Sequence, residues 1–444
     1  MILLAGCSSL GLDYARPDMQ LRAAYAEPQQ SDTRVDADTR WWTAFGDKQL
    51  TALVEAGLAQ NLSVLQAIER VEAARATARV NGVAYQPSLN GSASAITAGT
   101  IGTGADVATT SRSASLDASW QIDLFGAGRR TREAQLADIA AAEEAVNGAR
   151  LTLLGDIAST YVNIRTYARR LAIAQASLRT QTETTEVVRK QVAAGTATEL
   201  ALSQSIGQQQ STAAGIPSLQ AALQQSVNAL ALLMGQEPAA LKAMRSEAGR
   251  IPRTKASIGK GVPADLLRAR PDIRQAEREL ASAVATIGVR EADLLPSLTL
   301  AGALSTDTAT GSWNLGPTLS LPIFNRDRLT ASVDLAESTA RSAYLAYRET
   351  VLSAVREVED ALAAYKREKS RRSALAASVE AYAKAAELSQ SLYEAGSATY
   401  SELLSAQAAQ QSAEDALAQS DAALALDYIT LAQAMGGGWS VDAD

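Results

Sequence analysis

The amino-acid sequence predicts an α+β protein formed by tandem duplication, in which each copy holds a two-stranded hairpin and long antiparallel helices. Three observations support this fold class. Short motifs recur in the second half in the same order, apolar and polar residues alternate over four segments, and apolar residues spaced alternately three and four apart continue over long runs. The predicted strands therefore come as one pair per copy.

The duplication is supported by ordered matches between the two halves. The matched segments are 194–198 with 395–399, 230–235 with 431–436, 86–89 with 295–298, and 122–125 with 321–324. The first two pairs share one offset, that of Gly195 from Gly396. Small insertions and deletions in loops explain the drift of the other two, so we interpret the halves as copies of one unit.

Strict alternation of apolar and polar residues marks the strands. Residues 113–124 place apolar side chains on one face and polar side chains on the other, as a strand with one wet face does. Residues 88–95 alternate with smaller side chains, which predicts a strand at about 87–99. The second copy has matching strands at about 296–305 and 313–323. Stretches rich in Gly, Thr and Ser at 98–112 and 305–312 are the predicted hairpin loops.

After each hairpin the period becomes helical, with a heptad-type spacing. The run from Gly128 to Ala194, about 65 residues, would extend on the order of 100 Å as one helix. Gly195 and Gly396 are the predicted turns between antiparallel helices, because glycine adopts positive φ without strain. Pro217 predicts a local kink in the first copy only, since the second copy has Ala418 at that position.

Composition argues against several classes of function. The chain contains no His, which excludes His-based catalytic triads and His metal ligands. The net charge is −7 and the basic residues are spread along predicted helices, so we expect no nucleic-acid partner. Gly102-x-Gly104 lies in a loop without the βαβ context of a dinucleotide site. We therefore expect no enzymatic activity and no bound metal ion.

The single cysteine, Cys7, ends the stretch Leu4-Ala5-Gly6-Cys7, which resembles a bacterial lipobox. Signal peptidase would cut before Cys7, and its thiol and amino group would carry diacylglycerol and an N-acyl chain; we expect no other cofactor. Residues 1–6 would be the remnant of the signal peptide. A complete signal peptide has a basic region and a longer apolar region, so we expect the sequence to be truncated or its start misassigned.

The predicted strands also fit a membrane protein. No stretch approaches the 18 or more apolar residues of a spanning helix, whereas strands of about 9 to 11 residues can cross at the usual tilt. Exposed sheet edges are not tolerated in lipid, and four strands cannot enclose themselves. The chain must therefore assemble, with eight strands from two protomers or twelve from three, and the pattern alone leaves both possibilities open.

Several motifs resemble those of the TolC-like outer-membrane-factor family, in particular its lipoprotein subclass from drug-efflux systems. They are Trp41-Trp42-x-x-Phe45-x-Asp47, the Pro-Ser-Leu strand entries, Trp120-x-Ile122-Asp123-Leu124-Phe125-Gly126, and Leu266-Leu267-x-Ala-Arg270-Pro271-Asp272-Ile273 followed by Ala276-Glu277. The resemblance runs in order from about residue 13 to residue 438. For Pro271 at a helix start with Asp272 in the first turn, we favour ordinary capping chemistry.

The resemblance implies a homotrimer with a 12-stranded β-barrel in the outer membrane of a Gram-negative bacterium and a long α-helical barrel in the periplasm. Its implied function is passive conduction of small molecules delivered by a periplasmic adaptor protein and an inner-membrane pump of the RND type. The implied organisation is a lipidated segment at 7–40, a first repeat at 41–235, an equatorial linker at 236–262, a second repeat at 263–438 and a tail at 439–444.

The resemblance also implies roles for the two helix turns. The residues expected to contact the adaptor are Gly195, Thr196, Thr198, Gly396, Ser397 and Thr399. Glu402 stands where family members carry an acid that rings the pore entrance, and Glu199 is a second candidate from the other turn. Like charges held close raise one another's pKa and attract cations. This sequence departs from the family three residues later, where Ser405 replaces a second acid.

Two alternatives remain at this stage. A lipid-anchored coiled-coil scaffold without a pore would explain the heptads and the lipobox but not the alternating hairpins. The outer-membrane component of a type I protein secretion system would share the whole architecture, although the lipobox and the Trp41-Trp42 start resemble drug-efflux members more closely.

Overall fold

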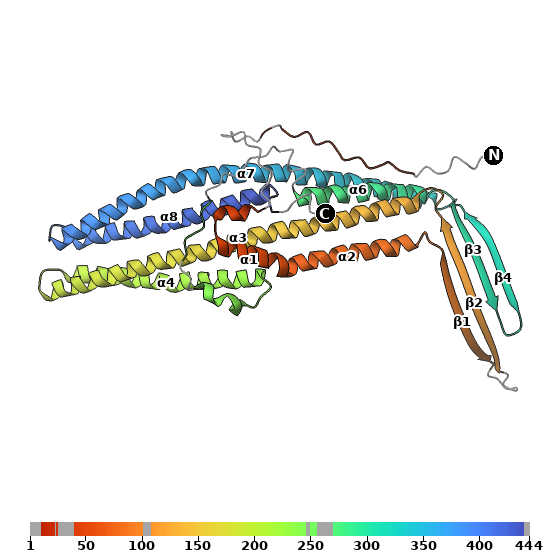
Figure 1. Cartoon of the computed structure of the whole chain (residues 1–444), viewed down its shortest axis with the longest axis horizontal. Helices are drawn as coiled ribbons and strands as arrows, with labels where there is room; N and C mark the ends of the chain where they lie inside the picture. The colour runs from red at the N-terminus through yellow and green to blue at the C-terminus, as the bar shows by residue number, and fades with distance from the viewer. Residues whose placement is uncertain are drawn as a thin grey trace. The chain divides into compact units, whose positions relative to one another are not determined.

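The computed structural model describes residues 10–22, 24, 40–100, 108–245, 249–254 and 270–438. Cys7 and the segments expected at 1–6 and 439–444 lie outside the described residues. The elements in chain order are η1 (Trp41–Phe45), α1 (Lys48–Gln60), α2 (Leu62–Val83), β1 (Ser88–Gly99), β2 (Ala108–Ile122), α3 (Ala127–Ala193), α4 (Glu199–Leu233), η2 (Pro238–Arg245), α6 (Pro271–Ala292), β3 (Ser297–Thr306), β4 (Gly311–Ser320), α7 (Arg326–Glu394) and α8 (Tyr400–Ala434) (Figure 1).

The element order confirms the duplicated, mostly helical architecture with four strands. The series α2, β1, β2, α3, α4 recurs as α6, β3, β4, α7, α8. The chain divides into two compact units: unit 1 comprises Met1–Gln20, Ile68–Ala145 and Asp272–Thr350, and unit 2 comprises Leu21–Ala67, Val146–Pro271 and Val351–Asp444. Unit 1 holds the sheet, and unit 2 holds both turns between the long helices.

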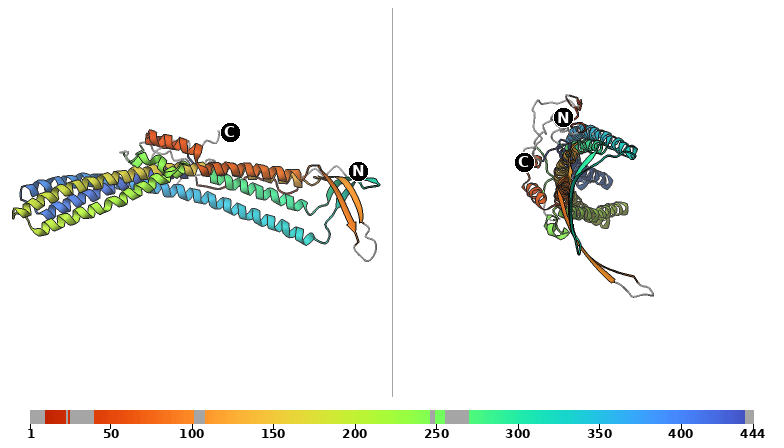
Figure 2. Two further views of the ribbon diagram at one scale, coloured as in Figure 1. Left: turned by 90° about the horizontal axis from the view of Figure 1, so that it is seen from below. Right: turned by 90° about the vertical axis from the view of Figure 1, so that its right-hand side faces the viewer.

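The four strands of unit 1 form one antiparallel sheet in the order β1-β2-β3-β4, seen as a curved ribbon in Figure 2. Its register aligns like residues across all four strands. One row is Gly91, Leu116, Leu304 and Trp313, and the next is Ser92, Ser115, Ser305 and Ser312. Successive residues of a strand point to opposite faces. The predicted division into an apolar face and a polar face therefore continues across the sheet.

The strand ends differ most from the predicted ones at the beginning of β2 and at the end of β4. Strand β2 begins at Ala108, so residues 108–112, predicted as loop, are paired with the end of β1. Threonine favours strands because it is β-branched, and the Thr97 and Thr110 hydroxyls lie 2.9 Å apart across this extension. Strand β4 ends at Ser320 rather than near 323, two residues before Pro322, which lacks the N–H that a ladder requires.

The long helices are continuous. Helices α3 and α7 have 67 and 69 residues, and α4 and α8 have 35 each. The kink expected at Pro217 does not interrupt α4, which runs from Glu199 to Leu233. Pro217 is exposed, so water can bond the carbonyl group that loses its helical partner. Within the described ranges, no helix combines the length and apolar character needed to cross a membrane.

The main core lies in unit 2, where η1 and α1 pack against α3, α4 and α8. Its fully buried members include Trp41, Leu50, Ile157, Tyr161, Leu230 and Ile429. The Tyr161 hydroxyl donates to Asp47 Oδ2 at 2.8 Å, and the buried Arg165 donates to the Tyr161 oxygen at 3.0 Å. Asp47 also caps α1 by accepting from the backbone N–H of Gln49 and Leu50. These bonds fix the start of the first repeat on α3.

We expect Leu230→Ala to destabilise unit 2 by about 2–5 kcal/mol, because it removes a fully buried side chain from a packed core. Leu230 exposes 0% of its surface, whereas Leu232, on the same helix turn, exposes 69%. Leu232→Ala is therefore the matched control. Thermal or denaturant unfolding of the detergent-solubilised protein checks this, and equal midpoints for the two variants would contradict the core assignment.

Candidate functional site at the helix turns

The two predicted turns have the same backbone structure. Gly195 has φ +75° and Gly396 has φ +72°. At the first turn, the N–H of Gly195 donates to the Val192 carbonyl at 2.9 Å and that of Thr196 to the Gln191 carbonyl at 2.9 Å. Gly396 and Ser397 make the equivalent bonds in the second copy. Each turn is thus a Schellman motif, which requires glycine at the position with positive φ.

The structure places the two turns at the same end of unit 2 (Figure 1). A bond between the repeats joins them, because the Tyr393 hydroxyl at the end of α7 donates to Gln191 Oε1 at the end of α3, at 2.6 Å. The Tyr393 and Tyr400 rings meet edge to face with centroids 6.1 Å apart. The six residues expected to contact an adaptor are all exposed, so this end of unit 2 presents two adjacent polar turns.

Glu402 takes part in a capping box that begins α8. Its Oε2 accepts from the backbone N–H of Thr399 at 2.7 Å and from the Thr399 hydroxyl at 3.0 Å, while the Glu402 N–H donates to Thr399 Oγ1 at 3.3 Å. The backbone and hydroxyl bonds from Thr399 lower the pKa of this exposed carboxyl. The Thr-x-x-Glu spacing is the sequence signal for this motif, although we expected only a pore role for Glu402.

Glu199 has a different position at the first turn. Thr198 caps α4 by accepting from the Ala201 N–H at 3.2 Å, so the third residue after the cap is alanine rather than an acid. Glu199 itself is the first residue of α4 and is exposed. An acid in the first turn interacts favourably with the helix dipole. The two candidate acids are therefore not equivalent, since the carboxylate of Glu402 is held by its own turn.

A cavity of about 550 Å³ lies between α3, α7 and α8 near the turns. Its lining includes Glu183, Gln191, Glu387, Gln390, Glu394 and Gln407. Farther from the turns, Arg170 of α3 holds Asp415 of α8 through two bonds of 2.7 and 3.0 Å. Such bidentate pairs fix orientation. Sequence reasoning did not identify these groups, because pairing between helices far apart in the chain leaves no local motif.

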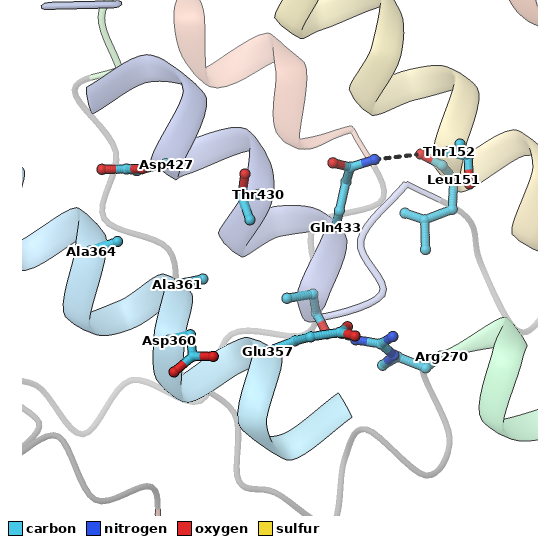
Figure 3. A pocket seen from close by; sticks show the side chains of 11 residues that line it. Leu151, Thr152, Arg270, Glu357, Asp360, Ala361, Ala364, Asp427, Thr430 and Gln433 are labelled. Carbon is cyan, nitrogen blue, oxygen red and sulfur yellow. Dashed lines mark hydrogen bonds and ion pairs between the residues drawn. The ribbon is translucent and has the colours of Figure 1, made fainter. Parts of the chain in front are cut away.

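A second cavity in unit 2, of about 470 Å³, is drawn in Figure 3. Helices α3, α7 and α8 supply its walls, including Leu151, Glu357, Asp427 and Gln433. Arg270 lies at one side, where it donates to Glu357 Oε2 at 2.7 Å and to the Ala434 carbonyl at 3.0 Å. Burial, and then the charge of Glu368, raise the pKa of Asp427. Arg270 thus secures the start of the second repeat to α7 and α8.

The expected capping chemistry beside Arg270 is also present. Helix α6 begins at Pro271, and Asp272 stands in its first turn. Proline is favoured at this position because its missing N–H would have no helical partner. This interpretation of the Arg-Pro-Asp motif is confirmed.

Comparison with known proteins places these features in one family. The family model described as outer membrane efflux protein matches residues 53–236 and 262–437. The chain belongs to the outer membrane efflux protein family. Among relatives, it is 37% identical to nodulation protein T of Rhizobium leguminosarum bv. viciae, covering 99% of this chain and 92% of that protein. It is 31% identical to the cation efflux system protein CusC of Escherichia coli, covering 99% and 97%.

Solved structures agree with the sequence relatives. The outer-membrane channel OprN superposes with a TM-score of 0.86 at 30% identity, covering 97% of this chain and 99% of that chain. The protein is thus an outer-membrane channel of an efflux system, with the TolC-like fold that the resemblance implied. Its relatives are channel proteins rather than enzymes.

We expect Glu402→Ala to increase amide hydrogen exchange at Thr399, because the carboxylate that accepts from this N–H is removed. The folded-state pKa of Glu402 is lowered. The protection of the Thr399 amide from exchange is therefore present at neutral pH. It is lost as the pH falls through the folded-state pKa of Glu402. Exchange rates corrected for intrinsic pH dependence check this, with the Thr198 turn as internal reference. Unchanged protection in Glu402→Ala would refute the capping box.

Proposed function

We propose that three copies of this outer membrane efflux protein close one continuous duct, each contributing four strands to a closed twelve-stranded sheet in the outer membrane. One observation carries the proposal. In the described structure β1 pairs only with β2 and β4 only with β3, so the sheet has two open edges. Lipid cannot satisfy the backbone groups of such edges, whereas the β4 edge of one copy can pair with the β1 edge of the next.

The apolar face of the sheet supports a membrane location. Its large side chains are exposed in the single chain, including Leu89, Leu116, Leu304, Trp313 and Leu315. Trp313 exposes 79% of its surface. Contiguous exposed apolar surface marks contact with lipid or with another protein. The strands have 12, 15, 10 and 10 residues, a length that suits tilted crossing of a bilayer at about 9 to 11 residues per strand.

The lipid anchor is the second part of the proposal. Cys7 would carry a diacylglycerol and an N-acyl chain, and several acyl chains together give stable anchoring where a single chain is marginal. The chain would then be held in the outer membrane by both its strands and its N-terminus, with the long helices in the periplasm.

The helix turns form the third part. The exposed residues around Gly195 and Gly396 would contact a periplasmic adaptor, which delivers small molecules from an inner-membrane pump of the RND type. Three copies of Glu402 and of Glu199 would surround the pore entrance. Carboxylates gathered around an axis attract cations, so the entrance would favour positively charged solutes while conduction itself stays passive.

Purified trimers in planar bilayers are expected to show small conductances that prefer cations. Glu402→Gln should reduce this preference because it removes the charge while glutamine can still complete the capping box. Thr399→Ala keeps the charge and breaks the cap, so it serves as the matched control. Unchanged ion selectivity in Glu402→Gln would remove Glu402 from the pore entrance, and a monomeric mass without any conductance would refute the duct.

Contact with the adaptor is tested by photo-crosslinking from Ser397 and Thr196. A crosslinker placed at either exposed turn residue should capture the periplasmic adaptor protein. The control position is Thr77 of α2, which is exposed and lies in unit 1. Capture from Thr77 but not from the turns would place the adaptor elsewhere on the chain.

A further inference from the structure

A short N-terminal strap, residues 10–14, is held in a built socket in unit 1. The strap begins where the sheet meets the helices, because the Leu10 N–H donates to the Phe125 carbonyl at 3.3 Å, three residues after β2 ends. It continues beside α6, where Tyr14 meets Glu277 and Arg278. The socket consists of Arg130 of α3 together with Glu277, Arg278 and Gly288 of α6.

Arg130 is the centre of the socket. Its side chain exposes 3% of its surface. Its Nε donates to the Leu10 carbonyl at 2.7 Å, and its Nη2 donates to the Gly11 carbonyl at 2.9 Å and to Asp13 Oδ1 at 2.9 Å. Glu133 balances the charge through a bond of 2.6 Å to Nη1. The planar guanidinium holds its N–H donors in a fixed geometry. The hydrogen bonds from Arg130 to the Leu10 and Gly11 carbonyls therefore fix the path of the strap backbone.

A pair of glycines lets the strap approach α6 closely. Gly11 has φ +84°, and a Cβ at that position would lie 2.7 Å from the Gly288 Cα. A Cβ at Gly288 would in turn lie 2.7 Å from the Leu10 carbonyl oxygen and 3.0 Å from Arg130 Cγ. The two 2.7 Å distances are shorter than real Cβ atoms make to their neighbours. The socket therefore admits the strap backbone only because both positions lack a side chain.

Tyr14 fixes the other end of the strap. Its hydroxyl donates to Glu277 Oε1 at 2.5 Å, and Arg278 lies over its ring, 5.9 Å from the centroid. Burial and this bond to the carboxylate raise the pKa of Tyr14, so the phenol remains a donor. Glu277 is itself buried. The contacts at Leu10 and at Tyr14, four positions further along the chain, thus determine both the position and the direction of the strap.

We propose that this socket sets the depth at which the acylated N-terminus enters the membrane, with Arg130 as the positioning residue. Cys7 precedes Leu10 by three residues, which span at most about 10 Å when fully extended. Docking of Leu10 beside Phe125 would therefore keep a lipid attached at Cys7 within that distance of the helix-side end of the sheet. The socket couples the depth of the acyl chains to the depth of the strands. This inference rests on the proposed acylation of Cys7.

The experiment uses the full chain, expressed with a bacterial lipoprotein signal peptide and purified from outer membranes. A nitroxide is attached at Leu12→Cys, because Leu12 exposes 78% of its surface. Metabolic labelling with palmitate reports acylation separately. Arg130→Ala is compared with Arg129→Ala, since Arg129 is the adjacent residue, exposes 54% of its side chain and also faces Glu133.

In Arg130→Ala, we expect unchanged palmitate labelling, a mobile nitroxide, and tryptic cleavage after Arg16 or Arg22 that is roughly tenfold faster, as loss of charged hydrogen bonds implies. Collision rates of the nitroxide with oxygen and with a water-soluble nickel chelate report its depth in the membrane. In Arg130→Ala the nitroxide should no longer have a single depth by this measurement. Arg129→Ala should match the unsubstituted chain in every readout. An immobile nitroxide at the original depth in a folded Arg130→Ala trimer would overturn the proposal.

Gly11→Val provides a second test that leaves the body of the protein unchanged, because only the strap is altered. It should release the strap as Arg130→Ala does, whereas Leu12→Ala should not. Absence of palmitate labelling in the unsubstituted chain would refute acylation of Cys7. If the chain takes up no palmitate and Arg130→Ala still speeds tryptic cleavage of the strap, the socket holds the strap but has no lipid to position. That result would overturn the depth-setting role.

Discussion

The hydrogen-bonding groups at the two edges of the sheet are the constraint on which the rest of the structure depends. A backbone N–H or C=O left unpaired in an apolar medium costs several kcal/mol. The β1 and β4 edges each carry such a row, and the sheet between them presents leucine and tryptophan side chains outward. A single chain cannot satisfy both requirements. Assembly is therefore a condition for the strands to exist in lipid.

The four strands and the long helices come from two copies of one unit. Both copies use the same Schellman turn at Gly195 and Gly396, and both end their second long helix at a glycine of positive φ, Gly235 and Gly436. The copies differ in the residues that follow the turns. Thr198 caps α4 alone, whereas Thr399 and Glu402 cap α8 reciprocally. The cap that begins α8 is consequently held by more bonds than the cap that begins α4, although both turns place a glycine of positive φ at the same position.

The sequence predicted what local patterns encode. Alternation identified all four strands, and glycine identified both turns, because each signal lies within a few residues of the element that it specifies. The predicted beginning of β2 was wrong, because residues 108–112 pair with β1 but show no alternation of apolar and polar residues. Contacts across the fold could not be predicted in the same way. Arg130 bonds to Leu10, and Arg170 to Asp415, over separations that leave no periodic trace.

Glu402 illustrates how a resemblance and a local motif can describe one side chain differently. The resemblance treats it as a free charge at a pore entrance, where neighbouring carboxylates would raise its pKa. Its own turn does the reverse, since two donors from Thr399 stabilise the ionised form. In the proposed trimer the two effects would oppose one another on the same carboxylate. A charge held ionised by its own turn could remain negative beside its symmetry mates. The capping box would therefore make a ring of three like charges less costly to maintain at neutral pH.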